Sequence, residues 1–129
     1  MLVRPLEKAD EEEIRRLDPE RANPAAVSFF ARTGHSFVAE EDGRPRGFVY
    51  AQPVWQGDRA VVLASALVAS DEETERALLA ALVKSARDAA AHEVALAVPG
   101  YEPPSGLGFS PAERVYRQRL RPVGVELER

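Results

Sequence analysis

The chain has 129 residues, of which 45% are hydrophobic and 29% are charged, as in an ordinary globular domain. This length fits one domain, residues 1–129, built around a single hydrophobic core. The absence of cysteine excludes disulfides, thiolate zinc sites and cysteine-ligated iron–sulfur clusters. Only His35 and His92 remain as imidazole ligands, and they lie on separate predicted elements. We therefore expect no metal site.

Charge and hydropathy limit the partners and the location. The net charge of −4 argues against a nucleic-acid surface, which is normally basic. No segment is long and apolar enough to span a bilayer, and the first residues do not resemble a signal peptide. These patterns predict a cytoplasmic protein that binds neither nucleic acid nor membranes.

The N-terminal part predicts one strand and two helices. Residues 2–6 alternate like a short strand, and Asp10 is the expected N-cap of the helix that follows. Asn23 before Pro24 predicts a second helix, with an N-cap and then proline at the first helical position. Gly34 is suited to end this helix.

The middle of the chain predicts a three-stranded meander. Residues 35–40 and 47–52 are expected to pair through an Asp-Gly hairpin turn at residues 42–43. Pro53 cannot donate a ladder hydrogen bond, so it predicts a bulge or an edge position. Residues 60–69 are almost continuously apolar, which is typical of a strand covered on both faces.

From Ser70 the apolar residues follow the period of a long helix. Ser70-x-x-Glu73 has the spacing of a capping box, in which each side chain accepts from the other residue's backbone N–H. Residues 93–98 form a second apolar strand, so we expect a βαβ crossover whose two strands are parallel neighbours at the sheet centre. A loop rich in proline and glycine follows at 99–108, and residues 115–120 predict a final strand.

This order of elements resembles the GNAT superfamily of acyl-CoA N-acyltransferases over nearly the whole chain. The best local matches are Arg-Ala-Leu-Leu at 76–79 and Leu-Gly-Phe at 107–109. Residues 30–37 and 54–57 are further similar to a small bacterial subfamily of GNAT-like proteins. The resemblance implies an α/β domain, an α+β sandwich whose mixed central sheet is flanked by helices.

The resemblance also implies where a coenzyme would bind. In GNAT enzymes, glycines between the central strand and the long helix let backbone N–H groups approach the pyrophosphate of acetyl-CoA. Here Glu73 and Glu75 stand at those glycine positions. A carboxylate about 4 Å from a phosphate oxygen repels it by roughly 1 kcal/mol in water and by about 4 kcal/mol at an effective dielectric of 20. The candidate contacts to acetyl-CoA are Val68, Ser70, Thr74 and Arg76.

The acidic turn predicts a degenerate acetyl-CoA site in a non-catalytic or binding module. The alternative is an active N-acetyltransferase that holds acetyl-CoA by unusual contacts and acts on an amine that the sequence does not name. In GNAT enzymes a tyrosine general acid often stands at the position that Pro104 occupies here, and Tyr101 is the nearest phenol. A third hypothesis is a protein that binds a partner, or forms a homodimer, through the splayed edge of the sheet.

The alternating arginines of the predicted last strand share one face, which either binds an anion or is a solvated edge protected by charge. These residues are Arg117, Arg119 and Arg121. Ser65, the only polar side chain of the central strand, is expected in hydrogen-bonded core. His35 and Trp55 either line a pocket on the meander or are ordinary packed residues. His92, near the end of the long helix, is a favourable cation there when protonated.

Overall fold

The computed structural model describes residues 1–112, 116–118 and 120. One mixed sheet has the strand order β1-β2-β3-β4-β5. The first four strands pair antiparallel, and β5 pairs parallel to β4. The strands are β1 (Leu2–Pro5), β2 (Phe37–Glu41), β3 (Arg44–Gln56), β4 (Arg59–Ala69) and β5 (Glu93–Leu96).

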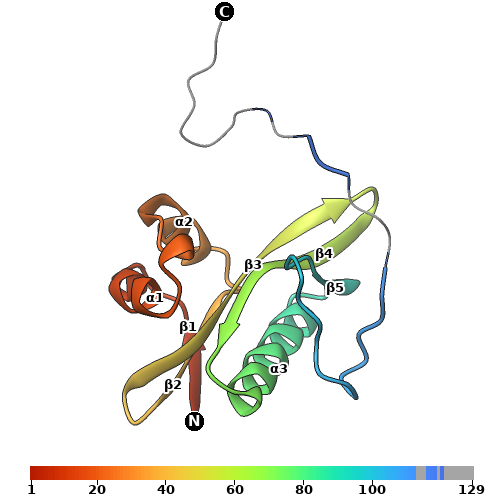
Figure 1. Cartoon of the computed structure of the whole chain (residues 1–129). Coiled ribbons are helices and arrows are strands. Elements are labelled where there is room, and N and C mark those ends of the chain that lie inside the picture. Colours follow the sequence, from red (N-terminus) through yellow and green to blue (C-terminus); the bar gives the residue numbers. More distant parts are fainter. Residues whose placement is uncertain (113–115, 119, 121–129) are drawn as a thin grey trace, which may run out of the picture.

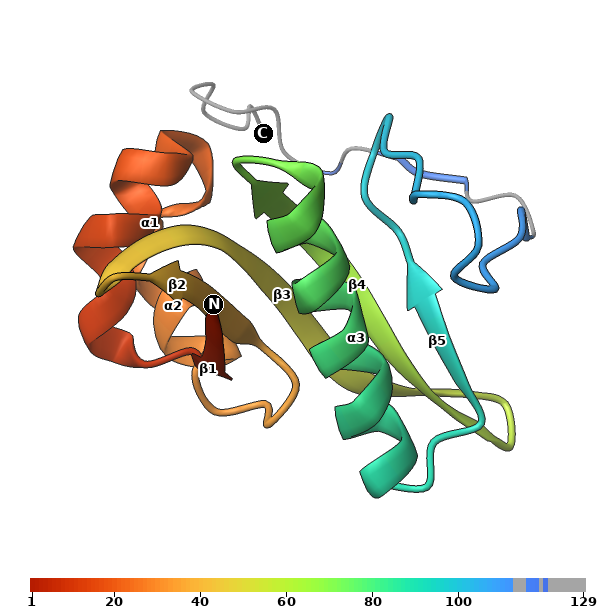
Figure 2. The ribbon, with the colours of Figure 1, turned by 90° about the horizontal axis from the view of Figure 1, so that it is seen from below.

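Helices cover both faces of this sheet (Figures 1 and 2). On one face lie α1 (Glu11–Leu17) and α2 (Pro24–Phe30), and on the other lies α3 (Glu72–Asp88). Leu78, Leu79 and Leu82 of α3 pack on one side of the sheet, and α1 and α2 bury a second cluster on the other side. The predicted mixed sheet flanked by helices is confirmed.

The two N-caps expected in the N-terminal part have different outcomes. The Asn23 side chain accepts from the N–H groups of the first turn of α2, at 2.8 and 3.3 Å, as predicted. Asp10 is not the side-chain cap of α1. Its carboxylate accepts instead from the Arg4 guanidinium, at 2.8 and 3.0 Å, and from the Glu7 backbone N–H at 2.8 Å. Because Asp10 is only 6% exposed, its charge requires this pairing with Arg4.

The predicted hairpin between β2 and β3 is confirmed. Asp42 and Gly43 have φ angles of 54° and 76°, the left-handed backbone that this turn requires. Pro53 lies beyond Val49, the last residue of β3 that pairs with β2, so its missing N–H falls on an open edge. Pro53 does not form a bulge. In the ladder between β3 and β4 the bulge falls at Ser65, which has no partner residue on β3.

The βαβ crossover is confirmed, since β4, α3 and β5 follow one another and the two strands are parallel neighbours. The expected central position is wrong for β5, which is the last strand of the sheet among the described residues. Its apolar character comes from Val94 and Leu96, which pack against the core beneath α3. Part of the predicted strand 115–120 lies outside the described residues, and residues 116–118 have no strand conformation.

Candidate functional site

The region that the sequence assigns to a coenzyme lies where β4 leaves β5 and α3 begins. The last paired residues of the two strands are Ala64 and Leu96, and the Ala97 N–H still donates to the Ala64 carbonyl at 2.8 Å. Beyond this point residues 65–69 continue β4 without a β5 partner, and the strands diverge (Figure 2). Residues 65–69 therefore lead to the first turn of α3 without a strand partner on the β5 side.

The N-cap of α3 is Asp71 rather than Ser70. The Asp71 carboxylate accepts from the Thr74 N–H at 2.8 Å. Ser70 still belongs to the end of the strand, because its N–H donates to the Arg46 carbonyl of β3 at 3.0 Å. The predicted capping box between Ser70 and Glu73 is therefore wrong, although the helix is capped by its own acidic side chain, as expected.

Thr74 is completely buried at the start of α3, and Gly47 of β3 is the reason it fits. A Cβ atom on Gly47 would lie 2.4 Å from the Val68 carbonyl oxygen and 3.0 Å from the Thr74 methyl carbon. The Thr74 hydroxyl has no hydrogen-bond partner among the described residues. The Thr74 side chain, and after it the Thr74 N–H, lower the pKa of Asp71.

Two arginines offset part of the negative charge of this turn. Arg46 lies 3.8 Å from the Asp71 carboxylate, and its Nε donates to the Ser70 hydroxyl at 3.3 Å. Arg76 pairs with Glu72 at 2.7 Å and donates to the Ser105 carbonyl at 3.3 Å. The turn thus has four carboxylates, at Asp71, Glu72, Glu73 and Glu75, against two guanidinium groups.

Tyr101 reaches this turn from the loop after β5. Its hydroxyl donates to the carboxylate of Glu75, one of the two glutamates at the glycine positions of the resemblance. Burial and the negative charge of Glu75 raise the pKa of Tyr101 above its ordinary value. The Tyr101 proton is therefore held more tightly than that of a free phenol, which disfavours proton donation at neutral pH.

The structure brings some predicted site residues together and separates others. Ser70, Thr74, Arg76 and Tyr101 gather around the first turn of α3. Val68 instead packs against the core on the opposite face of the sheet, with the residues beneath α1 and α2. Of the three arginines predicted to share one face, Arg117 is described, whereas Arg119 and Arg121 lie outside the described residues.

Among the remaining candidates, the two histidines have hydrogen-bond partners. His35 is 7% exposed; its Nδ1 lies 2.9 Å from the Ser85 hydroxyl, and burial lowers its pKa. His92 follows the end of α3, and its Nδ1 accepts from the Ala60 N–H at 3.0 Å. Ser65 is half-buried at the bulge rather than in hydrogen-bonded core. Trp55 is 73% exposed near the end of β3.

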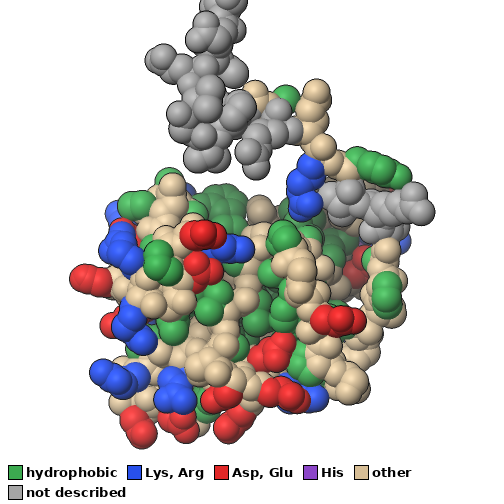
Figure 3. Space-filling model, in the orientation of Figure 1, with side chains coloured by type: hydrophobic (Ala, Val, Ile, Leu, Met, Phe, Trp, Pro, Cys, Tyr) green, Lys and Arg blue, Asp and Glu red, His purple; other side chains and the backbone are tan. Residues whose placement is uncertain are grey.

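The surface shows no single-sign charged region on the face of Figure 3. Acidic and basic side chains are mixed on the side of α1 and along the lower edge, and the centre of this face is mainly uncharged. Within the described residues, His, Asp and Glu side chains form no group of three that could hold a metal ion. None of the described helices is long and apolar enough to cross a membrane.

The fold of the chain is that of the GNAT acetyltransferases, as two solved structures show. The structure is similar to the aminoglycoside N-acetyltransferase AAC(6')-Iy in complex with CoA, with a TM-score of 0.68 and 21% identity over 93% of this chain and 99% of that chain. It is also similar to a ribosomal-protein-alanine N-acetyltransferase from Brucella melitensis biovar Abortus 2308, with a TM-score of 0.70 and 14% identity over 92% and 98%. At these identities the likeness shows the fold alone.

A family model and a more similar structure show to which family the chain belongs. Residues 9–102 match the family described as "Protein of unknown function (DUF1999)", and the chain belongs to that family. The structure of wild-type TTHA1254 from Thermus thermophilus has a TM-score of 0.74 and is 40% identical over 92% of this chain and 100% of that chain. No curated protein matches the chain.

Proposed function

We propose that this chain is a GNAT-fold binding module whose acetyl-CoA pyrophosphate site is degenerate and which does not catalyse acetyl transfer. The observation that carries the proposal is the start of α3, where Asp71 occupies the Thr74 N–H and three glutamates fill the first turn. A pyrophosphate would need the backbone donors that this carboxylate occupies.

Charge supports the same conclusion. The two arginines of this turn are already paired with Asp71 and Glu72, so a phosphate would have to compete with these carboxylates. Each remaining carboxylate about 4 Å from a phosphate oxygen costs roughly 1 to 4 kcal/mol, according to how far water screens the pair. Two such repulsions add up to about 2 to 8 kcal/mol, and about 4 kcal/mol separates micromolar from millimolar affinity.

The position of Tyr101 argues against catalysis. A general acid must reach the substrate and give up its proton in the transition state. Tyr101 instead donates to Glu75, and its raised pKa holds the proton on the phenol. The Tyr101 hydroxyl therefore links the loop after β5 to α3 through a hydrogen bond.

Calorimetric titration of the full chain with CoA and with acetyl-CoA tests the proposal. We expect no saturable heat at ligand concentrations up to about 1 mM and no rise in Tm. A site with a Kd of about 10 μM would stabilise the fold by about 2.7 kcal/mol at 100-fold excess over Kd, and such a result would refute the proposal.

A gain-of-binding variant tests the physical reason. Replacing both Glu73 and Glu75 by glycine removes two negative charges and should raise the affinity for CoA measurably. The matched control is Glu12→Gly in the first turn of α1, which makes a similar change away from this site. Equal CoA affinity in the double variant and the parent would mean that these carboxylates do not set the affinity.

The second candidate function is an active N-acetyltransferase with atypical acetyl-CoA binding. Two observations favour it: the described residues offer no acceptor to the N–H groups of Glu72 and Glu73, and residues 65–69 of β4 are unpaired on the β5 side. In that reaction an amine takes the acetyl group and CoA leaves as a thiol. Because the chain has no cysteine, a thiol reagent reacts only with the CoA that is released from acetyl-CoA. Release of CoA in the presence of an amine, at a rate above that without protein, would favour this function.

A further inference from the structure

A groove runs along α3, between this helix and the loop after β5. Its volume is about 320 Å³, at the lower end of the range of small-molecule sites. Most of its apolar side chains are only half-buried, so they offer a ligand apolar surface on both walls. These residues are Leu79, Ala80 and Val83 of α3 and Leu107 and Phe109 of the loop.

The loop wall of the groove is held in place by contacts to α3. Arg76 donates to the Ser105 carbonyl at 3.3 Å, and the Tyr101 hydroxyl donates to the Glu75 carboxylate. Phe109 packs against the core cluster that contains the α3 leucines. The groove is therefore formed before a ligand arrives, which lowers the entropy cost of binding.

The charged residues of the groove gather at the end nearer the C-terminus of α3. They are Lys84, Arg87 and Asp88. Lys84 pairs with Asp88 at 2.7 Å, but both side chains are well exposed, so this pair is weak and Lys84 is able to turn to another anion. Arg87 forms no ion pair with any residue that the structure describes. Two cations against one carboxylate leave a net positive charge that exceeds the roughly half negative charge of the helix end.

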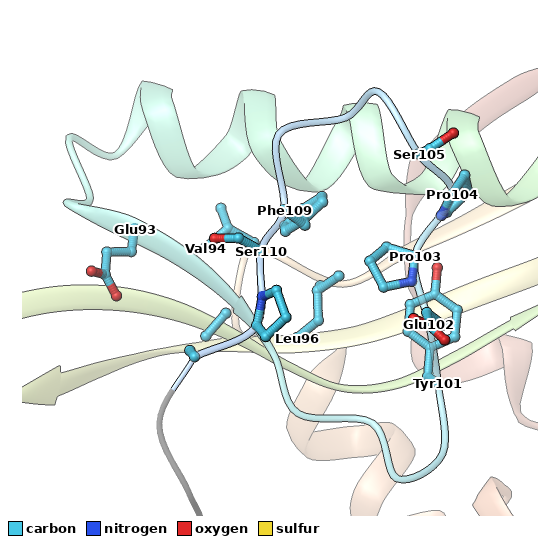
Figure 4. Close-up of a pocket in the computed structure, with 13 residues that line it drawn as sticks. Glu93, Val94, Leu96, Tyr101, Glu102, Pro103, Pro104, Ser105, Phe109 and Ser110 are labelled. Atoms are coloured by element: carbon cyan, nitrogen blue, oxygen red, sulfur yellow. The ribbon is translucent and has the colours of Figure 1, made fainter.

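A second cavity, of about 430 Å³, lies beside β5 and shares Phe109 with the groove (Figure 4). Its wall contains the carboxylates of Glu93, which pairs with Arg59, and of Glu102. No lysine or arginine is among the described residues of this wall. Charge therefore directs an anionic ligand to the groove along α3 rather than to the cavity beside β5.

We propose that the groove binds a linear aliphatic carboxylate of medium chain length. The hydrocarbon chain lies between Val83 and Phe109, and the carboxylate accepts from Arg87, with Lys84 as the second cation. From Leu79 to Arg87 the groove follows eight residues of α3, about 12 Å at 1.5 Å per residue, which suits a linear chain better than a single ring. The groove does not include the first turn of α3, so its occupancy does not depend on whether the chain binds CoA.

Titration of the full chain with octanoate and with 1-octanol tests the proposal. We expect saturable binding of octanoate, about tenfold tighter than that of 1-octanol, because only the carboxylate meets Arg87. Arg87→Gln should remove this difference and leave the affinity for 1-octanol unchanged. The matched control is Arg15→Gln, which removes an exposed guanidinium from α1 and should leave both affinities as in the parent. Absence of saturable octanoate binding at millimolar concentration, or equal octanoate affinity in Arg87→Gln and the parent, would overturn the proposal.

The apolar half of the groove is tested by Ala80→Gln. Ala80 is exposed and glutamine is a good helix former, so Tm should stay nearly unchanged while octanoate and 1-octanol both bind more weakly. Methyl NMR spectra of the parent locate the ligand, since octanoate should shift the signals of Val83 and Leu107 most. The largest shifts at Ala95 and Leu96 would instead place octanoate in the cavity beside β5, and the proposal would be wrong.

Discussion

The buried hydroxyl of Thr74 permits a sharp test of how the start of α3 is built. Thr74 is fully buried, and its Oγ1 has no hydrogen-bond partner among the described residues. Thr74→Val replaces this hydroxyl by a methyl group of similar size and keeps the β-branch. The backbone N–H that Asp71 caps is unchanged.

The expected effect is a gain in stability. A buried hydroxyl without a partner costs about 1–3 kcal/mol of desolvation, and a methyl group has no such cost. We take the lower end, about 1 kcal/mol, because the hydroxyl lies close to the Asp71 carboxylate. With an unfolding entropy of about 2.1 cal/mol/K per residue over 129 residues, this gain raises Tm by about 4 °C.

The matched control is Thr33→Val. It makes the same chemical change where the hydroxyl donates to the Ala51 carbonyl at 2.6 Å, so it should lower the free energy of unfolding by about 1 kcal/mol. Urea unfolding of the parent and both variants, with the slope m held in common, measures the two changes. If Thr74→Val also loses stability, the Thr74 hydroxyl donates a hydrogen bond in solution and our account of this turn is wrong.

Three further changes test other parts of the structure. Asp71→Ala should lower Tm by removing the helix cap, whereas Ser70→Ala should leave Tm almost unchanged; equal losses would contradict Asp71 as the N-cap. Gly47→Ala should destabilise the fold by about 1–3 kcal/mol, because the new Cβ meets the Val68 carbonyl, and an unchanged urea midpoint would contradict this contact. Stability should fall as pH drops below 6.5, because burial lowers the pKa of His35 and the unfolded chain takes up the proton first; a pH profile that is the same in His35→Gln would rule out this cause.

Comparison of two helix starts shows what local sequence can predict. Asn23 is followed by proline, which fixes the first helical residue, and the predicted cap is confirmed. Ser70 is followed by Asp71, an equally good acceptor, so spacing alone cannot choose between them. The choice is made by Arg46, 24 residues earlier, whose carbonyl accepts from the Ser70 N–H and keeps Ser70 in the ladder.

Long-range contacts also explain why the sequence mispredicts the position of β5 in the sheet and the place of the bulge. The apolar pattern of residues 93–98 predicts the strand and its parallel pairing, but whether a strand is central depends on what lies on its far side. The sequence marks Tyr101 only as the phenol nearest to Pro104, because no local pattern indicates that a loop residue will reach Glu75, 26 positions earlier. Proline at position 53 signalled an edge correctly, yet the bulge falls at Ser65, where the sequence shows no turn residue.

The acidic first turn of α3 has a structural role in addition to its effect on the charge of the site. Asp71 contacts Arg46 of β3, Glu72 contacts Arg76, and Glu75 accepts from Tyr101 of the loop after β5. These carboxylates therefore hold the strand before the helix and the loop after β5 in place. Replacing Asp71 would free the Thr74 N–H for a phosphate, whereas replacing Glu75 would release Tyr101 and with it the loop after β5. The carboxylates that repel an anion at the helix start therefore also fix the position of the loop after β5.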